Sequence, residues 1–145
     1  SERIALDPLL ACPNGIALDD NDNLYVANFT SGRIVKVTLD GNVSDFVELP
    51  GHNNGHIVYA GDGLLYATAR TANQIYAITV DGEVELLAGS GVRGHDDGPA
   101  LDATFSLPND INISPDGRIL YVNEVFDTNR SVNFPSVVRM IVLAR

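Results

Sequence analysis

One pattern occurs three times in this chain of 145 residues and constrains its fold more than any other feature. Each copy opens on Asn followed by Gly or Asp, at Asn14, Asn54 and Asn109, and continues with alternating apolar residues. A second apolar run with Leu-Tyr follows, at 24–25, 65–66 and 120–121, and then a third. The first two copies start 40 residues apart and the last two 55. A repeat of about forty residues built from short strands is typical of a propeller blade or a β-solenoid.

Each copy predicts short antiparallel strands, because the alternation has a period of two and the breaks carry turn residues. Asp-Gly pairs at 40–41 and 81–82 separate the last two runs of the first two copies. Asp-Gly between apolar runs indicates a tight hairpin, since Gly accepts the positive φ of the turn. No segment has a long helical period, and only residues 97–107 leave room for a short helical turn. The chain is therefore predicted to be all-β.

The strand count at the two ends of the chain predicts how the blades close. The last copy has runs at 110–114, 119–124 and 137–143 and lacks a fourth. Near the start, Leu6 lies eight residues before Asn14, just as Phe46 in the fourth run of the first copy lies eight residues before Asn54. The chain therefore begins with a segment that resembles a fourth strand. The predicted strands are enough for three four-stranded blades, with the fourth strand of the last blade placed at the start of the chain. Closed propellers typically have four to eight blades, so we expect two chains to form six, each N-terminal strand completing the partner's last blade. A fragment of a longer propeller is the alternative.

The predicted organisation is a single half-propeller domain over residues 1–145, with three four-stranded blades per chain, closed by homodimerisation with strand exchange. Its parts are the exchanged strand at 2–10, blades at 11–50 and 51–90, a lid-like loop at 89–107 and a blade at 108–145. The three Leu-Tyr tyrosines, Tyr25, Tyr66 and Tyr121, occupy equivalent positions and are expected to be buried between neighbouring blades. The single cysteine, Cys12, is expected to be a small buried side chain.

Residues 87–124 carry the most detailed family signal. Leu-Ala-Gly-Ser-Gly at 87–91, Asp-Gly-Pro-Ala at 97–100, Ala-Thr-Phe at 103–105 and Leu-Pro-Asn-Asp at 107–110 resemble the segment that leads into an NHL blade. Ser-Pro-Asp-Gly at 114–117 followed by Leu-Tyr-Val is similar to the gluconolactonase group of six-bladed propellers, which includes senescence marker protein, paraoxonase and strictosidine synthase. The resemblance covers residues 12–124 and implies a six-bladed propeller. This scaffold occurs in enzymes, sensors and protein-binding platforms, so the fold alone does not indicate the function.

Hairpin geometry brings the start of each first strand beside the end of the second, so polar residues there should surround one mouth of the central channel. The candidate ligand-binding residues at this mouth are Asn14, Asn28, Asn54, Arg70 and Asn123. The alternative is that an Asn before Gly at a strand entrance serves only the turn, because Asn tolerates the left-handed conformation.

The resemblance to gluconolactonase and paraoxonase implies a metal site at the same mouth. Asn109 and Asp110 are the candidate ligands of calcium or another divalent ion, since hard cations prefer amide and carboxylate oxygens. The candidate catalytic residues are His56, which could act as a base, and Glu124.

The amino-acid composition excludes some classes of binding partner. A net charge of −10 and a pI near 4.4 argue against nucleic acid and anionic membranes. No apolar run is long enough to span a bilayer, and no compartment can be assigned. Two functions remain: an NHL-like binding module that presents the channel mouth to a small ligand or protein, or a calcium-dependent lactonase or esterase. In the latter the ion would polarise the substrate carbonyl and activate water.

Overall fold

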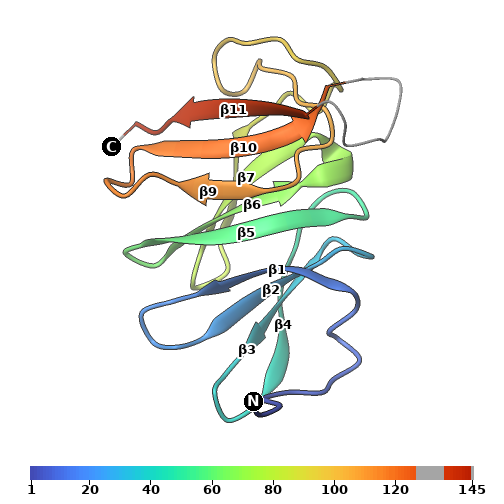
Figure 1. Cartoon of the computed structure of the whole chain (residues 1–145), viewed down its shortest axis with the longest axis vertical. Coiled ribbons are helices and arrows are strands. Elements are labelled where there is room, and N and C mark those ends of the chain that lie inside the picture. Colours follow the sequence, from blue (N-terminus) through green and yellow to red (C-terminus); the bar gives the residue numbers. More distant parts are fainter. Residues whose placement is uncertain (127–135, 145) are drawn as a thin grey trace.

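The computed structural model describes residues 1–126 and 136–144, which form three antiparallel sheets and no α-helix. The first sheet contains β1 (Pro13–Leu18), β2 (Leu24–Asn28), β3 (Arg33–Val37) and β4 (Val43–Glu48). The second contains β5 (Asn54–Gly61), β6 (Leu64–Ala69), β7 (Gln74–Thr79) and β8 (Val84–Ala88). The third contains β9 (Ile111–Ile113), β10 (Ile119–Val125) and β11 (Ser136–Val142). The sheets follow one another in chain order, with the N-terminus beside the first (Figure 1). The predicted all-β fold of blade-like sheets is confirmed.

Strands that follow one another in the sequence are neighbours in every sheet. Short polar turns join β1 to β2, β5 to β6, β7 to β8 and β9 to β10. In the first hairpin the Asp19 carboxylate accepts hydrogen bonds of 2.9 Å from the backbone N–H groups of Asn21 and Asn23. Asp22 completes that turn with a φ of 61°. Between β7 and β8 the turn has Gly82 at a φ of 93°, as the Asp-Gly signal predicts.

The third sheet differs from the other two at its outer edge. Strand β3 pairs with β4, and β7 pairs with β8. Strand β11 holds the corresponding place in the third sheet, but within the described residues it pairs only with β10. The sequence predicts that the last blade lacks a fourth strand, and the described part of the third sheet has only three strands.

The N-terminal segment, residues 1–12, contains no strand in this single chain. Its apolar side chains Ala5, Leu9 and Leu10 pack instead against the outer face of the first sheet, over Val26 and Val35. The predicted exchange of residues 2–10 into a partner's last blade stays a prediction, since it requires a second chain.

The hydrophobic core consists of layers between adjacent sheets. Tyr25 of β2 faces Leu65 of β6 in the first layer, and Tyr66 faces Leu120 of β10 in the second. Tyr25 and Tyr66 therefore each pack toward the next sheet along the chain. Tyr25 is 0 % exposed and Tyr66 6 %, but Tyr121 is 43 % exposed. The prediction that Tyr121 is buried is wrong for the single chain, because no described sheet follows the third.

Two smaller expectations have different outcomes. Residues 97–107 contain a hydrogen-bonded turn, in which the Asp102 and Ala103 N–H groups donate to the Pro99 carbonyl, and it does not extend into a helix. The one helical segment in the described chain is the short 3-10 turn η1 (Arg70–Ala72), so no described helix could cross a membrane. Cys12 is exposed rather than buried, because the N-terminal segment lies on the surface.

Candidate functional site

The ends of the strands bring the predicted Asn residues to the same edge of their sheets. Pro13 at the start of β1 pairs with Asn28 at the end of β2, and Asn54 pairs with Ala69. In the third sheet the Asn109 N–H donates to the Asn123 carbonyl at 3.0 Å. The first strands β1, β5 and β9 thus start where the second strands end, as the hairpin argument predicts.

The Gly of the Asn-Gly motif allows the first strands of neighbouring sheets to touch. A Cβ atom at Gly15 would lie 2.7 Å from the Cα of His56, and one at Gly55 would lie 2.1 Å from the Asn109 carbonyl oxygen. Both distances are shorter than any real contact, so Gly is required at these positions. The third copy of the motif has Asp110 in this place, and its side chain is exposed.

The Asp110 carboxylate contacts the His56 ring across the junction of the second and third sheets. The His56 Nδ1 lies 2.8 Å from Asp110 Oδ1, and the two side chains are 34 % and 54 % exposed. The backbone is held as well, because the His56 N–H donates to the Asn109 carbonyl at 2.7 Å. Asn123 fixes the position of Asp110 by accepting its N–H at 2.9 Å.

His56 lies where the regular pairing of β5 with β6 is interrupted, between Asn54 and Ile57. Such bulges redirect a side chain and are frequent beside functional sites. With Nδ1–H donated to Asp110, a neutral His56 has Nε2 available as a hydrogen-bond acceptor or base. The arrangement could bind a hydroxyl or amide group or abstract a proton.

Two of the predicted ligand-binding residues are fully buried. The Asn28 amide donates to the Leu9 carbonyl at 2.7 Å and accepts from the Ala11 N–H at 3.1 Å, so it anchors the N-terminal segment. Asn54 donates to the Arg33 carbonyl at 3.0 Å. Its side-chain oxygen is buried and has no hydrogen-bond partner among the described residues.

Arg70 and Asn14 complete the predicted set. Arg70 opens η1 directly after β6, and its N–H donates to the Asn53 carbonyl at 3.0 Å. Burial lowers the pKa of the Arg70 guanidinium, and the positive charge of Arg93 lowers it further. Asn14 is exposed on β1. Both residues therefore lie at the strand ends where the sequence places them.

Glu124 belongs to a separate, buried cluster. Its Oε2 accepts the Ser106 N–H at 2.8 Å, and its Oε1 lies 2.9 Å from Arg139 Nη1 and 3.0 Å from His95 Nδ1. Arg139 also pairs with Asp97 at 2.7 Å. These contacts join the segment 89–107 to β10 and β11; whether that segment covers a channel mouth stays a prediction. The candidate catalytic residues His56 and Glu124 therefore occupy different clusters.

Sequence reasoning did not identify His95, Asp97 and Arg139. One signal was present, because alternation along β11 places Arg139 on the same face as Ile141, which is buried. A charged residue on an inward-facing strand position indicates a buried ion pair.

The ligand types at the mouth suit a hard divalent ion. Asn109, Asp110 and the unpartnered Asn54 oxygen could supply oxygen ligands. Asp110 Oδ1 already accepts the Ile111 N–H at 2.9 Å beside its contact with His56, which leaves Oδ2 as its available atom. Within the described ranges, no group of three or more His, Cys, Asp or Glu residues is arranged to hold a metal.

Comparison with known sequences identifies an NHL repeat at residues 10–37, which spans β1 to β3. No curated protein sequence matches the chain.

Solved structures show the same fold over most of this chain. A protein of unknown function from Bacteroides thetaiotaomicron has a TM-score of 0.72 at 24 % identity, over 86 % of this chain and 34 % of its own. A gluconolactonase from Xanthomonas campestris has 0.63 at 17 %, over 79 % and 36 %. A chain of a nidogen/laminin complex has 0.61 at 15 %, over 79 % and 40 %. The expected NHL and gluconolactonase-like propeller fold is confirmed, and the chain spans less than half of each matched structure.

Proposed function

We propose that the chain is an NHL-like propeller module that binds a small polar molecule or a protein segment at the mouth formed by the starts of β1, β5 and β9. The observation that carries this proposal is the His56–Asp110 pair, which joins two sheets at 2.8 Å while both side chains stay partly exposed. A buried pair would serve the fold alone. A partly exposed pair held by backbone hydrogen bonds can offer Nε2 and Oδ2 to a ligand.

The related structures support a binding role in general terms. One matched chain comes from a complex of nidogen with laminin, so a propeller of this fold can take a protein partner. The acidic charge of the present chain favours ligands that are neutral or cationic.

We further propose that two chains work together as one particle. Each chain supplies three of the six blades, and the pairing would cover the third sheet, which the single chain leaves open on one face.

A calcium-dependent lactonase or esterase is the second candidate, favoured by the His56–Asp110 pair and by the gluconolactonase match. Asn109, Asp110 and Asn54 would hold the ion, which would polarise the substrate carbonyl. His56 would bind or deprotonate the attacking water through Nε2.

A thermal-shift screen of small polar compounds, with and without calcium, tests whether the chain binds a ligand at the His56–Asp110 pair. We expect hits whose stabilisation is lost in His56→Gln and Asp110→Asn and kept in Asp62→Asn, an exposed turn residue between β5 and β6. Hits that survive both substitutions would place binding elsewhere. Turnover of a lactone that requires calcium and is lost in His56→Gln would favour the hydrolase instead.

A further inference from the structure

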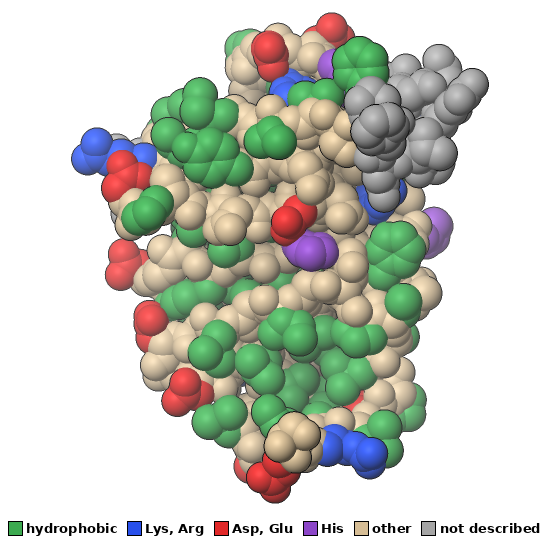
Figure 2. All heavy atoms as spheres, viewed as in Figure 1, with side chains coloured by type: hydrophobic (Ala, Val, Ile, Leu, Met, Phe, Trp, Pro, Cys, Tyr) green, Lys and Arg blue, Asp and Glu red, His purple; other side chains and the backbone are tan. Residues whose placement is uncertain are grey.

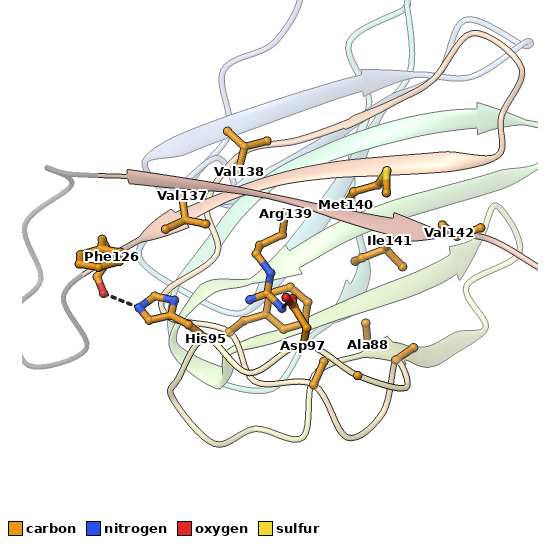
Figure 3. Close-up of a pocket in the computed structure, with 14 residues that line it drawn as sticks. Ala88, His95, Asp97, Phe126, Val137, Val138, Arg139, Met140, Ile141 and Val142 are labelled. Carbon is orange, nitrogen blue, oxygen red and sulfur yellow. Dashed lines mark hydrogen bonds and ion pairs between the residues drawn. The ribbon is translucent and has the colours of Figure 1, made fainter.

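A hollow runs along the outer edge of β11, on which no described strand lies. It has a volume of about 740 Å³, and six consecutive residues, Val137 to Val142, line one side of it. Side chains alternate between the faces of a strand, so six residues in a row can line one hollow only if it follows the strand's edge. The opposite side is formed by Ala88, Ala100, Ala103 and Phe105. Figure 3 shows Arg139 and Ile141 directed toward the side of Ala88, and Val138 directed away from it.

The same place is filled by a strand in the other two sheets. Strand β4 lies along the edge of β3, and β8 lies along the edge of β7. Lys36 of β3 pairs with Tyr25 of β2, and Met140 of β11 pairs with the equivalent Tyr121 of β10. Lys36 and Met140 therefore occupy equivalent positions in their sheets. The groove is therefore the position of a fourth strand.

The face beside the groove is apolar and uncovered. Val138, Met140 and Val142 are 71 %, 60 % and 70 % exposed, and Tyr121 lies beside them. Figure 2 shows hydrophobic side chains gathered over the third sheet. In the first sheet, Phe46 of β4 covers the equivalent tyrosine, with its ring 4.8 Å from that of Tyr25. The strand that fills the groove should thus carry an apolar residue in the place of Phe46.

The N-terminal segment meets this requirement and has no strand partner among the described residues. Leu6 has the sequence position of Phe46 relative to the following Asn and is 83 % exposed. Residues 1–6 form no hydrogen bond with any other described residue, whereas Leu9 and Ala11 are bound by Asn28. The N-terminus lies at the end of the stack opposite the third sheet (Figure 1), so the segment cannot reach β11 of its own chain.

We propose that the groove along β11 binds residues 3–6 of a second copy of this chain as an antiparallel strand. Backbone hydrogen bonds to Val138–Ile141 of β11, along which no described strand lies, would supply affinity, and Leu6 on Tyr121 would supply specificity. The register follows from β4, in which Ser44 pairs with Lys36, so Ile4 of one chain lies opposite Met140 of the other. This inference rests on the pairing of two chains proposed above and is independent of the His56 site.

Engineered cysteines test the register in the full chain. In a Cys12→Ser background, Ile4→Cys with Met140→Cys should form an intermolecular disulfide under mild oxidation, because directly opposed Cβ atoms are about 4.5–5.5 Å apart. The control combines Ile4→Cys with Val142→Cys, which lies on the same exposed face one pair out of register, and should crosslink several-fold less. Equal crosslinking of both pairs, or none in either, would overturn the proposed strand site.

Sedimentation separates the strand site from the wider pairing. We expect a dimer that Leu6→Glu dissociates, with the dissociation constant raised at least about tenfold. Leu39→Glu should not change it, although Leu39 is similarly exposed at 61 %. A dimer that resists Leu6→Glu would overturn the strand site while leaving the pairing of chains intact. A monomer at all concentrations would overturn both, and the His56 tests would still stand.

Discussion

The three described strands of the third sheet follow the same order as the first three of the second, but the two sheets have different surroundings. The second sheet packs against a neighbour on both faces, and its outer strand β8 completes it. Among the described residues, the third packs against a neighbouring sheet on one face only, and its last strand is β11. Equivalent side chains such as Tyr66 and Tyr121 consequently differ in exposure although both stand in the same Leu-Tyr motif. The motif sets the direction of the side chain, and the neighbouring sheet decides whether it is buried.

The largest expected effect separates Tyr25 from Tyr121. Tyr25→Ala should cost roughly 3–5 kcal/mol of unfolding free energy, the range for truncating a buried aromatic. Tyr121→Ala should cost below about 1 kcal/mol in the Leu6→Glu background, where the face is open, and several times more in the paired parent. Denaturant unfolding measures both. Equal costs for Tyr121→Ala in the two backgrounds would contradict the account of the open face.

The next effect compares a buried ion pair with an exposed one. Glu124→Gln removes a charge that Arg139 and His95 approach in a dry environment, so it should cost about 3 kcal/mol. Asp45→Asn breaks the exposed pair with Arg33 and should cost below about 1 kcal/mol. Chemical denaturation of both variants checks the contrast. A loss below 1 kcal/mol in Glu124→Gln would show that water reaches this cluster.

A smaller effect compares the hairpins that open the first two sheets. Burial raises the pKa of the Asp19 carboxyl, but hydrogen bonds from Asn23, Asn21 and Tyr25 outweigh it, and the net pKa is lowered. The stabilisation is present above about pH 4 and is lost as the pH falls through the folded pKa. Asp19→Asn should therefore cost about 1–2 kcal/mol at neutral pH and less at pH 3.

The matched control for Asp19 is Asp62→Asn in the second hairpin, where Asp62 is exposed in the turn. It should change stability by less than about 0.5 kcal/mol at either pH. Urea unfolding at pH 7 and pH 3 gives both values. A cost of Asp19→Asn that does not depend on pH would show that the carboxylate charge is unimportant there.

The smallest stability effect is expected where the starts of β5 and β9 meet. His56→Gln removes a partly exposed contact with the Asp110 carboxylate and should cost below about 1 kcal/mol, because solvent screens such contacts. A melting curve without ligand checks this value. A cost of several kcal/mol would assign the pair to the fold rather than to binding.

Local patterns predicted much of this structure. The alternation and Asp-Gly turns predicted the strands, and hairpin geometry predicted that Asn28, Asn54 and Asn123 lie at the same ends of their sheets. These features depend on residues close in sequence, where a period of two and a tight turn are sufficient.

The contacts that depend on the path of distant segments were not predicted. His56 and Asp110 were both candidates, one as a base and one as a metal ligand, but the irregular pairing of β5 that brings them together has no sequence signal. The role of Asn28 as an anchor depends on where the N-terminal segment lies. The cluster of Glu124 with His95 depends on the course of residues 89–107, which no periodicity specifies.

Amide hydrogen exchange along β11 tests most directly the claim that the open edge of the third sheet is filled by a second chain. Between Val137 and Val142, alternate N–H groups of β11 point away from β10, and no described strand pairs with them. We predict that in the parent protein these groups are protected about as well as those of β7, that Leu6→Glu removes this protection, and that β7 is unchanged. Rapid exchange of these groups in the parent, or equal protection in the parent and in Leu6→Glu, would contradict the claim.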